Sequence, residues 1–213
     1  MESKAQTPPT QASRFPLSLL KVQSWFEGSV SQTPLQELLG QAETKTYKDG
    51  VRYYTWPQFG VQLETHTSPQ TSIETVVNIF LFVGVPKRLP VSLDTDGLPY
   101  GLLLTWTAAD LVQAFGEPER KSGGGMAEIS LEYTRLGVAF DMRCKVWEDA
   151  MAGIGQVVIF KRGDPTKGNC GVCKKPAELR CSSCKLVLYC GANCQSLHWK
   201  GGHKKLCPTV KYF

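Results

Sequence analysis

Seven of the eight cysteines of this sequence lie between residues 170 and 207, at spacings that suit metal ligands. Two pairs have the form Cys-x2-Cys, which closes a tight turn with both thiolates directed toward one ion. A gap of three residues, by contrast, places two ligands on one face of a helical turn. In chain order the pairs are Cys170 with Cys173, Cys181 with Cys184, Cys190 with Cys194, and His203 with Cys207.

Eight sulfur and nitrogen donors are enough for two closed tetrahedral sites, with no position left open for a reactive water. Such soft donors in tetrahedral geometry favour zinc over the other common metals. The sequence therefore predicts two structural Zn²⁺ ions per chain rather than a catalytic metal.

An even number of cysteines also permits a disulfide framework. Residues 1–13, however, contain no apolar segment of the kind that forms a secretory signal peptide. The most apolar stretch, Val76–Val85, is far too short to cross a membrane. A reducing compartment favours metal-bound thiolates over disulfides. We therefore expect an intracellular protein, in the cytoplasm or the nucleus, without a membrane partner.

The order and spacing of the ligands resemble the MYND-type zinc finger over residues 170–207. Tyr189 before the fifth ligand, Gln195 directly after the sixth, and Trp199 ahead of the histidine ligand add to the resemblance. The resemblance implies two interleaved zinc sites. One would be held by Cys170, Cys173, Cys190 and Cys194, and the other by Cys181, Cys184, His203 and Cys207.

The resemblance also implies a function, because members of this family bind short proline-containing peptides. Gln195 and Trp199 lie four residues apart, so they project from one helix face. A tryptophan face can stack a proline ring while a strand edge pairs with the main chain of the peptide. The alternative is that Trp199 only packs the small core between the sites. The candidate peptide-binding residues are Leu188, Tyr189, Gln195 and Trp199.

The net charge of +5 is divided unevenly along the chain. Residues 161–213 hold eleven lysines and arginines against two acidic residues, whereas residues 1–160 hold thirteen against seventeen. A basic finger suits nucleic acid, an acidic protein surface, or simply solvent. The sequence offers no recognition helix in a known setting and no aromatic platform for stacking bases. Protein partners are therefore favoured, and a nucleic-acid-associated transcriptional regulator is the alternative.

With 213 residues, 42% of them apolar and 20% charged, the chain can form one ordinary domain beside the finger. The segment that joins the two is rich in glycine and turn-forming residues. We expect a disordered tail at residues 1–14, an α+β domain at 15–162, a linker at 163–169, the finger at 170–207 and a tail at 208–213.

Within the α+β domain the sequence predicts a tandem repeat of one helix followed by a three-stranded meander. Each helix begins at a capping threonine and ends at a glycine, Gly40 in the first copy and Gly116 in the second. A second glycine, Gly60 or Gly137, follows 20 or 21 residues later, so the register is kept. Chance similarity between two amphipathic segments is the alternative.

The two copies, at about residues 33–82 and 105–160, would contribute six strands with the helices packed on one face. The segment after each helix carries acidic residues and is expected to be a turn. The expected strands are Val51–Trp56, Phe59–Leu63 and a segment anchored by Ile73, Val76 and Val77, then Glu128–Tyr133, Leu136–Phe140 and a segment anchored by Ile154, Val157 and Val158.

Outside the finger, no constellation of residues supports catalysis. His66, near the end of an expected strand, has no acidic or nucleophilic partner in a recognisable motif. Cys144 stands between two cationic residues, a setting typical of reactive thiols, but no general base lies at a fixed spacing. We therefore expect a non-enzymatic adaptor or regulator that binds other proteins through the zinc finger.

Overall fold

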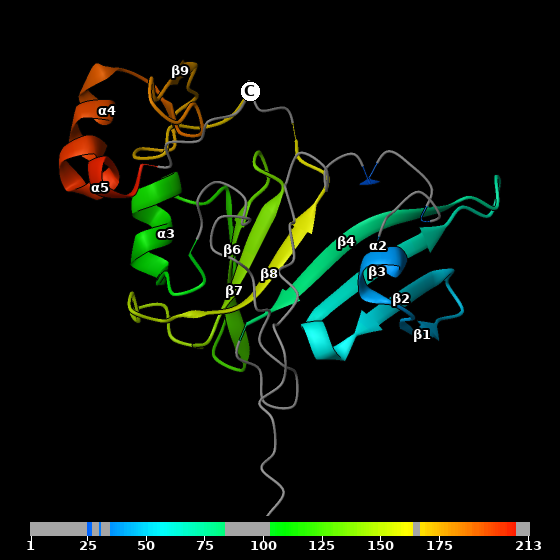
Figure 1. Cartoon of the computed structure of the whole chain (residues 1–213). Helices are drawn as coiled ribbons and strands as arrows, with labels where there is room; N and C mark the ends of the chain where they lie inside the picture. Colours follow the sequence, from blue (N-terminus) through cyan, green and yellow to red (C-terminus); the bar gives the residue numbers. More distant parts are fainter. Residues whose placement is uncertain (1–24, 27–29, 31–34, 84–102, 164–166, 208–213) are drawn as a thin grey trace, which may run out of the picture.

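The computed structural model describes residues 25–26, 30, 35–83, 103–163 and 167–207. The expected tails at both ends, and part of the expected linker, lie outside the described residues. Figure 1 shows a twisted sheet with short helices beside it, and the cysteine-rich segment next to the helix of residues 108–115.

Within the described residues, eight strands form one antiparallel sheet, in the spatial order β1-β2-β3-β4-β8-β7-β6-β5. The first four strands make one meander and the last four make another. The two meanders meet in the middle of the sheet, where β4 pairs with β8. The strands are β1 (Glu43–Thr46), β2 (Val51–Trp56), β3 (Val61–Thr67), β4 (Glu74–Phe82), β5 (Arg120–Gly124), β6 (Ala127–Tyr133), β7 (Val138–Met142) and β8 (Ile154–Phe160).

The expectation of six strands is wrong, because each meander has four strands rather than three. The additional strands are β1 and β5, which occupy the segments that the sequence predicts to be acidic turns. All four residues of β1 are exposed, and so is almost all of β5. Both are edge strands, for which polar side chains and little apolar alternation are usual, so the periodicity used to recognise the other six is missing.

Two helices of the sheet domain, α2 (Leu35–Leu39) and α3 (Ala108–Phe115), each precede one meander. Helix α3 begins with a capping box in which Thr107 and Asp110 satisfy each other's backbone N–H groups. A short 3-10 turn, η2 (Pro57–Phe59), lies between β2 and β3.

The side chains that α3 buries pack on the second meander. Its buried residues are Leu111, Ala114 and Phe115. The ring of Phe115 stacks on Phe140 of β7, with centroids 6.2 Å apart, and meets Tyr133 of β6 edge-on at 5.5 Å. Helix α3, which begins at the capping box of Thr107, thus supplies buried side chains to the core of the second meander.

One face of the sheet is apolar and buried across both meanders. The register places Trp56 opposite Val61, Val61 opposite Leu81, and Leu81 opposite Val157, so these side chains form one row across four strands. All four are at most 1% exposed. Apart from the buried Ala139 of β7, the opposite face carries half-buried and exposed side chains, and none of the described helices packs against it.

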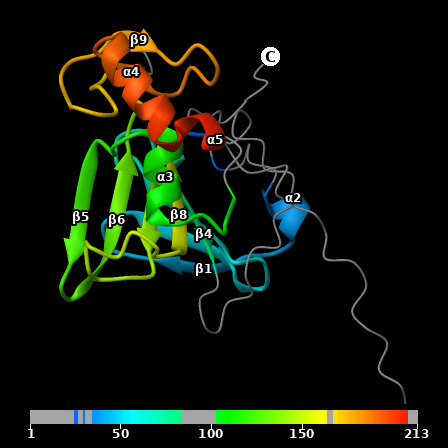
Figure 2. The ribbon, with the colours of Figure 1, turned by 90° about the vertical axis from the view of Figure 1, so that its left-hand side faces the viewer.

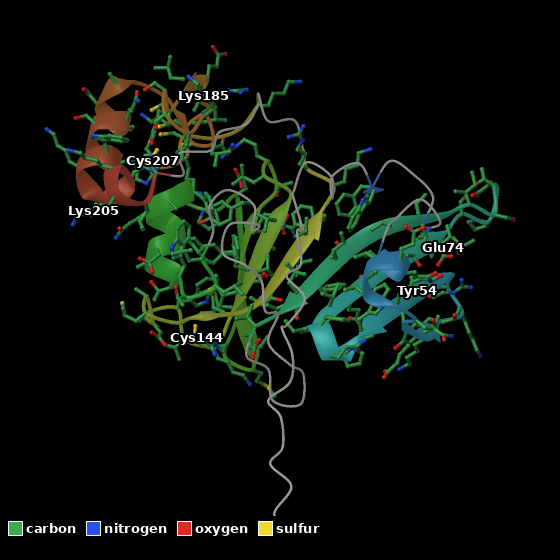
Figure 3. The ribbon with its side chains drawn as sticks, viewed as in Figure 1. Tyr54, Glu74, Cys144, Lys185, Lys205 and Cys207 are labelled. Atoms are coloured by element: carbon green, nitrogen blue, oxygen red, sulfur yellow. The ribbon has the colours of Figure 1, made fainter. Side chains whose placement is uncertain are left out.

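Hydrogen-bonded polar side chains of β2, β3 and β4 gather around Glu74, at the start of β4. Glu74 accepts hydrogen bonds from Arg52, Tyr54 and Thr65, all at 2.6–3.1 Å. Figure 3 labels Tyr54 and Glu74 in the first meander. Because Thr65 is fully buried, the carboxylate gives its hydroxyl a partner that water does not supply.

The cysteine-rich segment is held together by very short elements. Strand β9 (Leu179–Arg180) pairs with β10 (Leu188–Tyr189). Helix α4 (Ala192–His198) continues through the segment η5 (Trp199–His203), which is kinked at Gly202, into helix α5 (Lys204–Leu206). Figure 2 shows these elements above the C-terminal end of α3. Among the described residues, no helix is long and apolar enough to cross a membrane.

Candidate metal centre

Four thiols from two separate segments, residues 170–173 and 190–194, meet in the first of two ligand groups. The Sγ atom of Cys173 lies 3.4 Å from that of Cys190 and 3.8 Å from that of Cys194, and the Cys190 and Cys194 sulfurs are 3.6 Å apart. Cys170 completes the group, in which all four ligand atoms lie within 4.8 Å of one another.

The second group contains three thiols and one imidazole. The Nε2 atom of His203 lies 3.4 Å from the Sγ atom of Cys181 and 3.7 Å from that of Cys184. The Sγ atom of Cys207 lies 3.9 Å from that of Cys181 and completes the group. The ligand pairs are therefore interleaved: the first pair in the sequence shares a group with the third, and the second pair shares a group with the fourth. The family resemblance implies the same two groups.

The separations between the ligand atoms fit zinc. In a tetrahedral site with Zn–S bonds of about 2.3 Å, neighbouring sulfurs lie about 3.8 Å apart. The observed sulfur–sulfur distances of 3.4–3.9 Å surround this value and are far longer than a disulfide bond of about 2.05 Å. All eight cysteines are unpaired. Two Zn²⁺ ions, rather than a disulfide framework, are therefore consistent with the two groups.

Two of the thiols, Cys184 in one group and Cys194 in the other, have raised pKa values and do not ionise at neutral pH without a cation. Burial, and then the neighbouring sulfurs of Cys181 and Cys207, raise the pKa of Cys184 to about 12. Hydrogen bonding to Cys190 and burial raise the pKa of Cys194 to about 12 as well. Four crowded thiols cannot all ionise without a positive ion among them, so thiolate formation and metal binding are coupled.

The second nitrogen of His203 is bound to the sheet domain. Its Nδ1 atom lies 3.0 Å from the carbonyl oxygen of Gln113 in α3. A carbonyl only accepts, so the proton is on Nδ1 and the Nε2 lone pair faces the thiols. Burial lowers the pKa of His203, which favours the neutral form that a metal requires. Helix α3 therefore fixes the tautomer and orientation of a metal ligand.

His198, which the sequence places near the ligands, lies outside both groups. Its Nδ1 atom is 2.9 Å from the hydroxyl of Tyr189, and its Nε2 atom is 3.3 Å from the carbonyl oxygen of Val112. Its ring stacks on that of His203, with centroids 4.6 Å apart and planes 15° apart. Both imidazoles thus lie over the C-terminal carbonyls of α3, where hydrogen-bond donors are favoured.

The backbone of the finger also touches the end of α3. The N–H of Glu117 donates to the carbonyl of Gly171 at 2.9 Å, and a side chain at Gly116 would begin 2.8 Å from the Cα atom of Gly171. Lys174 donates to the carbonyl of Pro118 from the finger side. This close packing was not predictable from the spacing of the ligands, since a ligand pattern says nothing of what surrounds it.

The four candidate peptide-binding residues fall into two environments. Leu188 is 1% exposed and Tyr189 is fully buried, so both side chains belong to the core of the finger. Gln195 is half-buried, and Trp199 is 36% exposed with its ring edge-on to His203 at a centroid distance of 5.9 Å. The indole therefore packs against a metal ligand and reaches the surface.

The two candidates outside the finger lie apart from it. His66 is exposed in β3. Cys144 is half-buried beside an apolar pocket of about 330 Å³, which Trp147, Ile129 and Met142 also line. Figure 3 shows Cys144 at the end of the sheet domain away from Cys207.

Comparison with known families decides the identity of the cysteine-rich segment. The model of the MYND finger matches residues 170–207, the same range over which the eight ligands are found. Residues 170–207 are a MYND finger. The MYND finger is a zinc-binding module for protein interaction, so the expected family is confirmed, while the sheet domain remains unassigned.

The similar curated proteins share only a region of about the size of the finger. Ubiquitin carboxyl-terminal hydrolase 17 of Arabidopsis thaliana is 51% identical over 43 residues, which cover 20% of this chain and 6% of that protein. Ubiquitin C-terminal hydrolase 15 of Oryza sativa subsp. japonica is 49% identical over 49 residues, or 23% of this chain and 5% of that protein. The chain thus spans less than a tenth of these relatives. No solved structure gives a significant match.

Proposed function

We propose that this chain is a non-enzymatic intracellular adaptor or regulator whose MYND finger binds short proline-containing segments of other proteins. The observation that carries the proposal is the placement of Trp199, which is exposed on one side and packed against the ligand His203 on the other. A rigid, partly exposed indole is a suitable surface for a proline ring, because little side-chain entropy is lost on binding.

Gln195 extends this surface along the helix. The N–H of Trp199 donates to the carbonyl of Gln195, so the two side chains are one turn apart on the same face. The amide of Gln195 is half-buried and is long enough to hydrogen-bond a peptide main chain beside the indole. Together the two residues provide one apolar and one polar contact.

Leu188 and Tyr189 act in this proposal as support and not as direct contacts. Their side chains are buried, and the carbonyl of Leu188 accepts from the N–H of Gly171 at 2.9 Å. Tyr189 holds His198 through its hydroxyl, and His198 stacks on His203. The strand thus fixes the histidine layer on which Trp199 rests.

We also infer that the two meanders of the sheet domain are an internal repeat. Gly60 and Gly137 make the same contacts: each N–H donates to the carbonyl three residues earlier, and each carbonyl accepts from the last phenylalanine of its meander. These partners are Phe82 at 2.8 Å and Phe160 at 2.9 Å. Both glycines have positive φ angles, 63° and 70°. A pair of meanders offers a broad surface beside the finger, as an adaptor requires.

The ubiquitin hydrolases named above share only the finger region, so the proposal takes no hydrolase activity from them. Their similarity supports the view that a finger of this type serves as one module of a larger protein. The role proposed here for the finger is recognition.

The proposal is tested by adding proline-containing peptides to the zinc-loaded full chain and following the indole resonances by NMR. The chain contains five tryptophans, so five indole N–H signals are expected, and a Trp199→Phe variant assigns one of them. A peptide that binds the finger moves the Trp199 signal and leaves that of Trp56, which is 1% exposed, in place. If no peptide in a proline-containing set moves the Trp199 signal, the recognition role is rejected.

A further inference from the structure

A broad depression lies on the helix-free face of the first meander, far from the zinc ligands in the fold. It has a volume of about 1050 Å³ and is lined by side chains of β1 to β4 and of β8. In the register of the sheet, Lys45 lies opposite Tyr53, and Tyr53 opposite Glu64. These residues therefore point to the same side, away from the buried row that contains Trp56.

Aromatic rings form the floor of the depression. The ring of Tyr53 meets Tyr47 edge-on at a centroid distance of 5.8 Å and lies 6.5 Å from Phe80, tilted by 40°. Tyr47 is an exposed residue, while Tyr53 and Phe80 are half-buried. Such a row of rings on an open sheet face is unusual for a surface that only contacts water, since it leaves apolar area exposed.

Carboxylates outnumber amines around these rings. Glu43, Asp49 and Glu64 line the depression, and Lys45 is the one cation among the described lining residues. Asn78 donates to Oε2 of Glu64 at 3.1 Å and so orients this carboxylate. Burial, and then the charge of Glu64, raise the pKa of Tyr53, as expected in negative surroundings. The face is therefore both aromatic and acidic.

We propose that this face is a second docking surface, which binds an arginine-bearing basic segment of a partner protein. A guanidinium stacks on aromatic rings and pairs with a carboxylate through two parallel hydrogen bonds, so it matches a site where Tyr53 adjoins Glu64. The chain itself shows that the rings accept a cation, because the Nζ atom of Lys45 lies 4.9 Å from the centroid of the Tyr47 ring. The same negative charge repels the phosphates of nucleic acid.

The test is calorimetric titration of the zinc-loaded full chain with a short peptide in which arginine and leucine alternate. The matched peptide carries citrulline, which keeps the shape of arginine and removes its charge. We expect the citrulline peptide to bind at least about tenfold more weakly, because the charge-assisted hydrogen bonds and the cation–π attraction to the rings are lost. Equal affinity for the two peptides would overturn the proposal.

Protein variants locate the binding. Glu64→Gln removes the charge but keeps an acceptor for Asn78, and should lower the affinity for the arginine peptide about fivefold or more. Glu43→Gln changes an exposed residue that the fold does not need, and should also weaken binding. Glu37→Gln, an exposed residue of α2 on the helix side, is the control and should leave the affinity unchanged. The proposal fails if Glu64→Gln and Glu43→Gln both bind like the control.

Two other occupants would give distinct results. If the peptide binds only after Lys87 and Arg88 are both replaced by serine, a segment of the chain itself occupies the face, and the proposal of a partner is overturned. It is likewise overturned if the chain self-associates in sedimentation experiments and Glu64→Gln makes it monomeric, because the basic finger of a second copy would then be the ligand.

Discussion

Trp56 and Tyr133 make the same hydrogen bond in the two halves of the sheet. The indole Nε1 of Trp56 donates to the carbonyl of Gly40 at 2.9 Å, and the hydroxyl of Tyr133 donates to the carbonyl of Gly116 at 3.0 Å. Each aromatic residue ends the second strand of its meander, and each glycine follows the helix of its meander. Two chemically different rings thus join helix to sheet at equivalent positions, which supports the proposed repeat.

These two hydrogen bonds should contribute measurably to stability. Tyr133→Phe leaves the buried carbonyl of Gly116 without its donor and should lower the free energy of unfolding by about 1–2 kcal/mol. Trp56→Phe should cost more, because a smaller ring also leaves a cavity. Urea unfolding of zinc-loaded protein measures both. Tyr47→Phe, at an exposed ring, is the control; equal stability of Tyr133→Phe and this control would show that the bond is not needed.

Substitution at the turn glycines separates conformational strain from steric overlap. Gly137 has φ of 70°, and a Cβ atom there would lie 2.5 Å from the carbonyl oxygen of Phe160. Gly125 has φ of 67° but no atom within 4 Å of such a Cβ. Gly125→Ala should therefore cost about 1–2 kcal/mol from the backbone alone, and Gly137→Ala clearly more. Thermal unfolding compares them, and equal losses would contradict the close approach to Phe160.

The metal content follows from the two ligand groups. Elemental analysis of the folded chain should give two zinc ions per chain, and Cys144→Ser should leave this number unchanged because Cys144 lies in neither group. Cys190→Ser should lose one site, and a finger of this size has too small a core to stay folded without its metal. One zinc or none in the folded wild-type chain, or a loss in Cys144→Ser, would contradict the assignment.

Removal of zinc should weaken the hydrogen bonds that join the finger to the C-terminal end of α3. His203 joins the metal group to the carbonyl of Gln113, and the N–H of Glu117 is bound by Gly171 of the finger. After chelation, hydrogen exchange at the amide of Glu117 should become faster, since its acceptor belongs to a segment that unfolds. The amide of Phe82, bound to Gly60 in the first meander, is the control. An unchanged rate at Glu117 would show that the finger and α3 are not coupled.

Much of this molecule could be predicted from its local chemistry. The capping residues and ending glycines of the helices, the ligand spacing, and the alternation of β2 and β6 are all properties of short segments. Strands β1 and β5 were missed because an edge strand needs no apolar face. The burial of Leu188 and Tyr189 follows from the small size of the finger, which has few other apolar residues with which to form a core.

The contacts between the finger and α3 were beyond sequence reasoning for a different reason. Gln113 contributes only its backbone carbonyl to His203, and any residue at that position would do so. Gly116 and Gly171 matter because they lack side chains where two segments meet. Such features leave no residue pattern that identifies the partner.

If the finger recognises proline-containing segments through Trp199, the loss of this indole must weaken the binding of such peptides. The affinity of the best proline-containing peptide is measured for the zinc-loaded full chain and for Trp199→Ala, with Leu197→Ala as the control because Leu197 is an exposed residue of α4, which ends at the C-cap Trp199. We predict that Trp199→Ala keeps both zinc ions and binds the peptide about tenfold or more weakly, while Leu197→Ala binds like the wild type. Unchanged affinity in a folded, zinc-loaded Trp199→Ala would contradict the claim and leave the indole as part of the core.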